Sequence, residues 1–259
     1  SRLLERLLHA LNYNVNSMSY DKDIPDIIMN SGNEIVREFL RMYYEGDGGV
    51  SRNCVKVVSK SKNIANKLSY LLLRFGLVSR ISYELAKTNF AEKYSYNNYF
   101  YNLKFYGNDL NIFRNKIGFF SDEKNNKLKN CCENVGLNKN DTIPFIHSKI
   151  RELRKAGKIT HKEFYNATRM HAHNIENPNN RFGISRHGLN LICSSLDGFQ
   201  EIKEIVDGDF YCDYIKSINI VYPKEDYYLY DFNIPDLHSF IGGFGGILLH
   251  NTQSSLLEG

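Results

Sequence analysis

The sequence predicts an α+β protein built from three unlike parts, because three kinds of pattern follow one another along the chain. Residues 1–130 alternate between helix-like and strand-like segments, residues 131–200 are helical and basic, and residues 201–251 show short strand patterns. The 259 residues, 42% hydrophobic and 24% charged, are enough for two or more small domains. The net charge is only +4, so nucleic-acid binding has to be argued from local patches.

Composition narrows the class of protein further. No apolar run approaches the ~20 residues that a membrane-spanning helix requires, and the amphipathic opening segment does not have the pattern of a signal peptide. The cysteines are odd in number and lack the spacing of zinc ligands, which favours a reduced compartment without disulfides; they are Cys54, Cys131, Cys132, Cys193 and Cys212. We therefore expect a cytoplasmic protein with no membrane partner.

The first segments are predicted to be helical. Leucines recur at helical spacing within Ser1–Tyr13, and because the chain starts in the middle of this pattern without Met we expect residues upstream. Ser31 and Glu34 have the spacing of a capping box, which predicts a helix from there to Gly48. We expect Gly46 to admit a second backbone, and Asp47 to be held at the helix end beside it.

The remaining segments of the first part alternate in type. Val50–Lys60 is predicted as one strand that places Arg52, Lys56 and Lys60 on a DNA-binding face. A helix over Ile64–Phe75 should end at Gly76. Two strands and a helix complete the order, at Val78–Glu84, Tyr99–Tyr106 and Asp109–Lys116.

This order resembles one repeat of a LAGLIDADG homing endonuclease. Leu40–Gly48 aligns with the nine-residue motif of that family, with Glu45 where the motif has Asp. The resemblance makes Asp47 the residue that binds the catalytic metal. It also implies two active-site lysines: Lys22, within a Lys-x-Ile-Pro-like signature, and Lys124, near the end of the repeat.

The resemblance implies Mg²⁺-dependent hydrolysis of a double-stranded DNA homing site. Phosphodiester hydrolysis requires divalent metal held by carboxylates, and nearby lysines can assist it electrostatically. The family takes one acidic residue from each of two repeats. This chain carries one such motif, so we expect the other repeat upstream of Ser1.

The second part is predicted to be a small basic helical unit. One helix is spaced by Ile146, Ile150 and Leu153, a second runs from a Thr160/Glu163 capping box through Met170, and Ser185 caps a third toward Leu191. Thr142–Asn190 contains nine basic and three acidic residues, a net charge of +6. The candidates for phosphate contacts are Arg151, Arg154, Lys155, Lys158, Lys162, Arg169 and Arg186. A helical linker with a solvated basic face is the alternative.

The third part ends in a sequence that can cleave its own backbone. Strands are predicted over Gly208–Val221 and Tyr227–Ile234, and after the glycine run Gly242–Gly246 a further strand leads to His250-Asn251-Thr252. The side-chain amide of Asn can attack its own carbonyl and cut the following peptide bond. A neighbouring His can transfer the proton, and a Thr hydroxyl can act as a nucleophile.

Tyr230–Thr252 resembles the C-terminal splicing region of inteins, within an all-β Hint splicing domain. The resemblance implies that Asn251 cyclises with help from His250 and His238, that Thr252 accepts the acyl group, and that Asp231 orients these steps. Splicing needs no cofactor. The N-terminal half of the splicing domain, with its opening nucleophile, and the N-extein are expected upstream, and flexible glycines are expected to let the last strand fold back.

Two further resemblances extend this reading. The basic helical unit resembles the accessory DNA-binding subdomains of large archaeal-type inteins. Residues 252–259 would begin the C-extein, and Thr252–Glu258 resembles a segment of MoxR-type AAA+ ATPases.

The sequence therefore predicts intein-mediated splicing combined with site-specific DNA cleavage. The alternatives are a degenerate intein that binds DNA without cutting it, and a non-catalytic DNA-binding regulator. A hedgehog-like autoprocessing domain has the same β fold but lacks the terminal His-Asn that this chain carries.

Overall fold

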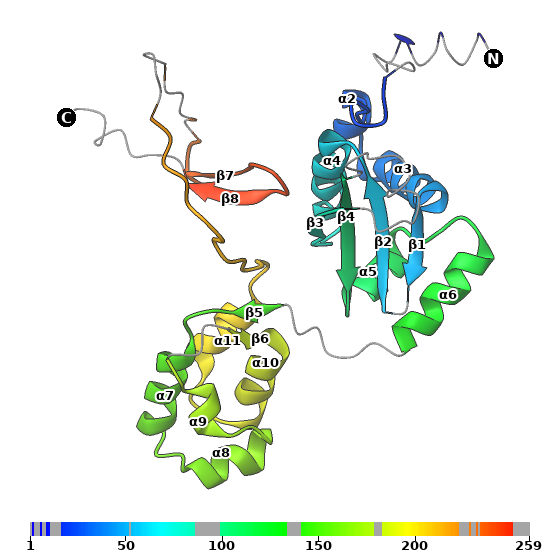
Figure 1. Ribbon diagram of the computed structural model, residues 1–259. Coiled ribbons are helices and arrows are strands. Elements are labelled where there is room, and N and C mark those ends of the chain that lie inside the picture. Colours follow the sequence, from blue (N-terminus) through cyan, green and yellow to red (C-terminus); the bar gives the residue numbers. More distant parts are fainter. Residues whose placement is uncertain are drawn as a thin grey trace. The chain divides into compact units, whose positions relative to one another are not determined.

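The structure is a computed structural model that divides into two compact units (Figure 1). One unit combines residues 1–135 and 223–259, and the other is Gly136–Tyr222. The described residues are 2, 6, 9, 10, 17–51, 53–85, 99–133, 141–178, 183–222, 228, 232 and 234–250. The helix predicted over Ser1–Tyr13 lies largely outside them.

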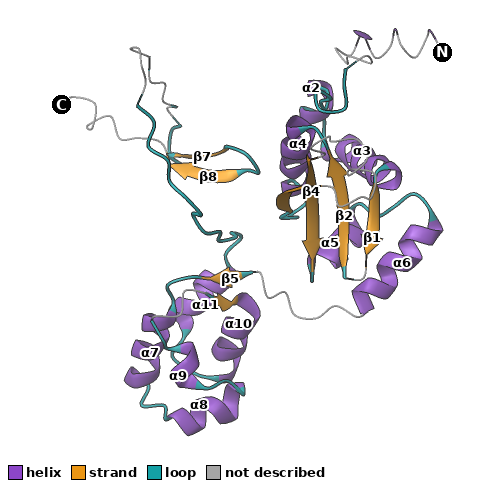
Figure 2. Ribbon diagram, viewed as in Figure 1, coloured by secondary structure: helices purple, strands orange, loops and turns teal. Residues whose placement is uncertain are grey.

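The first unit is built around a four-stranded antiparallel sheet in the order β1-β2-β4-β3 (Figure 2). The strands are β1 Gly48–Ser51, β2 Cys54–Ser59, β3 Arg80–Leu85 and β4 Tyr99–Tyr106. The helices are α2 Asp26–Met29, α3 Asn33–Gly46, α4 Lys62–Leu73, α5 Asp109–Lys116 and α6 Asp122–Glu133. One face of the sheet shares a buried core with the helices, and the opposite, polar face carries mainly charged and polar side chains, with Val58 among its apolar exceptions.

Tyr44 of α3 lies at the centre of this core. Its ring is fully buried, with its centroid 5.1 Å from that of Phe113 and 6.0 Å from that of Phe105. Leu40 precedes it by one helical turn, and Leu68 of α4 is buried in the same core. The core therefore fixes the orientation of α3 on the sheet, and with it the direction in which the end of α3 points.

Most of the predicted elements of the first unit are confirmed, and two predictions are wrong. The helix of Asp109–Lys116 and the strand Tyr99–Tyr106 have the predicted bounds, while α4 and β3 shift by a few residues. Val50–Lys60 is a hairpin with Ser51 paired to Cys54, not one strand. Ser31 does not cap α3, because its hydroxyl donates to the carbonyl of Ile27 and Gly32 takes the cap position.

The second unit is a helical bundle with its own core. Its elements are β5 Thr142–Ile143, α7 His147–Ala156, α8 His161–Thr168, α9 Ala172–Ile175, β6 Ile184–Ser185, α10 Arg186–Ser195 and α11 Gln200–Asp207. The capping box of Thr160 and Glu163 and the Ser185 cap are both confirmed. Ile202 and Val206 of α11 are buried with Ile150 in one cluster, so this unit extends beyond residue 200.

The C-terminal segment forms one hairpin among the described residues. β7 Ser239–Gly242 pairs with β8 Ile247–His250. The strand predicted over Gly208–Val221 is wrong, because these residues have no regular secondary structure. Most of Tyr227–Ile234 lies outside the described residues.

The buried hydroxyl of Tyr44 has no hydrogen-bond partner among the described residues, and burial raises its pKa far above the ordinary value. Because an unpaired buried polar group is unfavourable, Tyr44→Phe should raise the free energy of unfolding by about 1 kcal/mol at neutral pH. The raised pKa adds a pH dependence. Unfolded Tyr ionises near pH ~10, so the parent loses stability above that pH and the variant retains it.

Urea unfolding of parent and variant at pH ~7 and pH ~10.5 measures both effects. A destabilised Tyr44→Phe protein would contradict this description, because it would mean that the hydroxyl makes a favourable hydrogen bond.

Candidate functional site

Asp47 lies where α3 ends and β1 begins. It is the C-terminal cap of α3, with φ −103° and ψ −11°, and its N–H donates to the carbonyl of Tyr43 at 2.9 Å. Its carboxylate is exposed and accepts no hydrogen bond from the described residues. A Cβ at Gly48 would lie 2.7 Å from Tyr44 Cδ1, so only glycine lets the chain leave the helix this tightly.

Lys124 of α6 contacts the same helix end. Its ammonium donates to the carbonyls of Gly48 at 2.9 Å and Tyr44 at 3.4 Å, and also to that of Glu45. The C-terminus of a helix carries partial negative charge, which a lysine stabilises. The structure thus brings two of the predicted active-site residues, Asp47 and Lys124, to one helix end.

Glu45 holds the start of α6 in place. Its Oε2 accepts the backbone N–H of Phe120 at 2.9 Å and of Ser121 at 3.1 Å. The hydrogen bond from Ser121 is the main reason that the pKa of Glu45 is lowered. This carboxylate already binds protein groups, so Asp47 is the acidic residue of the motif that is open to solvent.

Lys22 lies in the loop before α2, and its side chain is exposed. The loop is tied to α4, because Lys67 Nζ contacts Asp23 at 2.9 Å and Asp26 at 3.0 Å. Ser61 also donates a hydrogen bond to the carbonyl of Lys22. No contact joins the Lys22 side chain to Asp47 or Lys124 within the described ranges.

The polar face of the sheet carries a row of cations. The strand registers align Lys56 of β2 with Lys104 of β4, and Lys104 with Arg80 of β3. Lys104 also contacts Glu84 at 3.4 Å. Lys60 follows β2 and is exposed, whereas Arg52 lies outside the described residues.

Arg80 and Lys104 were not among the predicted DNA contacts, although the sequence contains a pattern that identifies them. In β3 and β4 charged or polar residues alternate with apolar ones, so Arg80 points away from the core that contains Leu103 and Phe105. Reading the same alternation in all strands finds this row.

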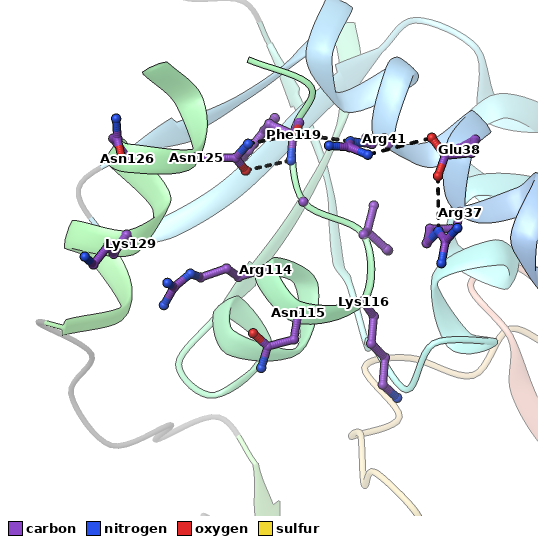
Figure 3. Close-up of a pocket in the computed structure, with 12 residues that line it drawn as sticks. Arg37, Glu38, Arg41, Arg114, Asn115, Lys116, Phe119, Asn125, Asn126 and Lys129 are labelled. Atoms are coloured by element: carbon purple, nitrogen blue, oxygen red, sulfur yellow. Dashed lines mark hydrogen bonds and ion pairs between the residues drawn. The ribbon is translucent and has the colours of Figure 1, made fainter. Parts of the chain in front are cut away.

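A separate basic hollow of about 470 Å³ lies beside α3, α5 and α6 (Figure 3). Its charged lining comprises five cations and one carboxylate: Arg37, Arg41, Arg114, Lys116, Lys129 and Glu38. Arg41 and Lys116 donate to the backbone carbonyls of Phe119 and Phe75, respectively. None of the predicted site residues lines this hollow.

Two of the predicted phosphate contacts in the helical unit are instead held in internal interactions. Arg154 is buried, and its guanidinium binds the buried carboxylate of Glu176 and the carbonyl of Ile159. Arg186 binds Asp141 at 3.0 Å and the carbonyl of Gly208 at 3.1 Å. The predicted contacts that remain exposed are Arg151, Lys155, Lys158, Lys162 and Arg169.

The C-terminal hairpin brings the two predicted splicing histidines together. Ser239 pairs with His250, and the rings of His238 and His250 are stacked with centroids 6.3 Å apart. His238 adopts a left-handed backbone, φ 50°, as the chain turns into β7. Asp231, Asn251 and Thr252 lie outside the described residues.

Two features are absent from the described residues, one concerning metal ions and one concerning membranes. No group of three or more His, Cys, Asp or Glu side chains is placed to hold a metal ion there. Nor does any helix in that part combine the length and apolar character needed to cross a membrane.

The first unit thus joins an antiparallel sheet that carries a row of cations on one face to a helix that ends in an exposed carboxylate. Residues 34–118, which run from α3 past the end of α5, match the model of the family described as LAGLIDADG-like domain.

Curated relatives match the chain over different lengths. This chain is 31% identical over 137 residues to the replication factor C small subunit of Methanocaldococcus jannaschii. That match covers 52% of this chain and 7% of the relative. RNA polymerase subunit Rpo1C of the same organism is 26% identical over 93% of this chain and 27% of its own length. Elongation factor 2 of Methanopyrus kandleri is 24% identical over 96% of this chain and 18% of its own length. The chain thus spans about a quarter or less of these relatives.

Proposed function

We propose that this chain is part of an intein whose LAGLIDADG-like repeat cleaves DNA and whose C-terminal hairpin takes part in protein splicing. One observation carries the proposal. Related segments recur within proteins named for replication, transcription and translation, and each match covers only a small part of the relative. A segment shared by proteins of such different function is best explained as an inserted element.

For DNA cleavage, Asp47 would hold a divalent cation such as Mg²⁺. Its exposed carboxylate suits this role, and a bound cation would supply Lewis acidity and activate water. One carboxylate does not complete such a site, so a second must come from another repeat. Lys124, whose ammonium binds three carbonyls at the same helix end, would lend positive charge near the developing negative charge of the phosphate.

The exposed side of α3 supports the association of a second repeat. Ile35 and Met42 are more than half exposed, and Gly46 follows one turn later. Nothing lies within 4 Å of a Cβ built at Gly46, so the space for a close helix partner is open. A partner helix packed on this stripe would end beside Asp47 and could supply the second carboxylate.

DNA would lie on the polar face of the sheet. The row of Lys56, Lys104 and Arg80 faces away from the core and matches the charge of a phosphate backbone. The exposed cations of the helical unit would add contacts without reading sequence.

For splicing, Asn251 would cyclise and Thr252 would accept the acyl group, with Asp231 orienting the groups. His250 immediately precedes Asn251 in the chain, and the stacked pair that it forms with His238 could supply the proton transfer. The hairpin also leaves apolar surface exposed, including Leu248 at 70%. This surface would suit packing against the N-terminal half of a splicing domain.

A degenerate intein that binds DNA without cutting it is the second candidate. Asp47 is the one exposed carboxylate of the motif among the described residues, and without a second carboxylate the chain would bind DNA without hydrolysing it.

Asp47→Asn is expected to abolish cleavage of the target duplex by the intact protein, because the amide cannot replace the charged ligand. Splicing should be unchanged. Asp197→Asn, the same substitution at an exposed acid of the helical unit, should retain cleavage. Full cleavage by Asp47→Asn would remove this residue from the active site.

Asn251→Ala is expected to block release of the peptide that begins at Thr252, because no side-chain amide remains to cyclise. His250→Ala should slow that release by ~100-fold or more if the His is a general acid. His187→Ala, at an exposed His of α10, is the control. Mass spectrometry of the intact precursor reads the released peptide and the C-terminal succinimide, and release from Asn251→Ala at the parent rate would contradict the mechanism.

A further inference from the structure

The glycine-rich turn of the C-terminal hairpin contacts one side of α4 in the same unit. Tyr70 Oη donates to the carbonyl of Gly243 at 2.8 Å, and the N–H of Gly245 donates to Asn66 Oδ1 at 2.8 Å. Asn66 and Tyr70 are four residues apart, so they share a face of the helix. Two hydrogen bonds thus join segments that are more than 170 residues apart in the chain.

An aromatic contact accompanies these bonds. The ring centroid of Phe244 lies 5.8 Å from that of Tyr101 in β4, and Lys62 Nζ lies 5.5 Å from the Phe244 ring. Lys62 is one turn before Asn66 on the same side of α4. Phe244 therefore reaches both the helix and the sheet, although β8 of its own hairpin is exposed throughout.

The backbone geometry of the turn and its closeness to α4 require glycine at several positions. Gly243, Gly245 and Gly246 have φ of 72°, 87° and 79°, in the left-handed region that favours glycine. A Cβ on Gly246 would also lie 2.6 Å from Leu73 Cδ1 of α4. These glycines were predicted to provide flexibility, whereas in the structure they shape a tight turn and let it approach the helix.

The hairpin needs such support, because two strands of four residues each are at best marginally stable in water. Ile247 and Leu248 are exposed by 57% and 70%, so little packing along β8 holds the strands together. The hydrogen bonds and the Phe244 contact hold the turn end of the hairpin in place. The stacked histidines lie at the other end of the same strands, where Ser239 pairs with His250.

We propose that α4 is a docking site for the Gly243–Gly246 turn, and that the DNA-cleaving repeat thereby positions the histidines used in C-terminal cleavage. The docking stands on the contacts alone. The positioning role rests on the proposed splicing function, with Asn66, Tyr70 and Phe244 as positioning residues.

Hydrogen exchange of the full 259-residue chain tests the docking. In the double variant Asn66→Ala/Tyr70→Phe, the amides of Gly245 and β8 should exchange about tenfold faster or more, because two hydrogen bonds are lost. Phe244→Ala, which leaves α4 intact, should act in the same direction. The amides of Leu68 and Leu72 in α4 should keep their protection in both variants. Asn63→Ala/Tyr20→Phe makes the same substitutions at exposed positions and should change nothing. Unchanged exchange of Gly245 and β8 in both docking variants would overturn the docking.

The rate of C-terminal cleavage in the intact precursor tests the positioning role. Both docking variants should release the Thr252 peptide severalfold more slowly, while the control double variant releases it at the parent rate. Parent rates in the docking variants, with Asn251→Ala still blocking release, would overturn the positioning role alone. Release from Asn251→Ala would overturn the splicing mechanism and the positioning role with it, and the exchange data would still decide the docking.

Discussion

The negative end of α3 is the constraint on which the rest of the first unit depends. A helix C-terminus leaves carbonyls without partners inside the helix, and here the ammonium of Lys124 binds three carbonyls of that turn. Glu45 binds the backbone at the start of α6, so the two helices hold each other from both sides. With the carbonyls and Glu45 engaged, Asp47 is left as the exposed carboxylate at the turn into β1.

Side chains alternate along the strands of the sheet, so one face packs against the helices and the other face carries the cations. Side chains such as Val55 and Leu103 point to the helices and form the core around Tyr44, while Lys56 and Arg80 point to the opposite face. One set of strands thus fixes α3 on one side and presents a basic surface on the other. The hairpin also has two different ends: its turn contacts α4, and its far end carries the histidine pair.

Local periodicity predicted most of the first unit, and long-range pairing explains what it missed. The sequence pattern does indicate the hairpin of β1 and β2. Val50 and Val55 are an odd number of residues apart, so a single strand would place these two valines on opposite faces, whereas the hairpin pairs them. Arg154 was predicted to be a surface cation, because its buried partner Glu176 is 22 residues away in the sequence. Lys124 was matched by its place in a motif, but its contact with the end of α3 depends on how α6 folds back.

The central claim, that the duplex lies on the polar face of the sheet, can be tested by two matched pairs of cations. Lys56→Gln/Arg80→Gln removes one Lys and one Arg from that face, and Lys129→Gln/Arg114→Gln removes the same pair from the basic hollow beside α3, α5 and α6. The measurement is DNA affinity as a function of salt concentration. We predict that the slope of log affinity against log salt becomes shallower by about 1.8 in the sheet variant, since each phosphate contact contributes ~0.9, and that it stays unchanged in the hollow variant. If the slope became shallower in the hollow variant and stayed unchanged in the sheet variant, the result would contradict the account.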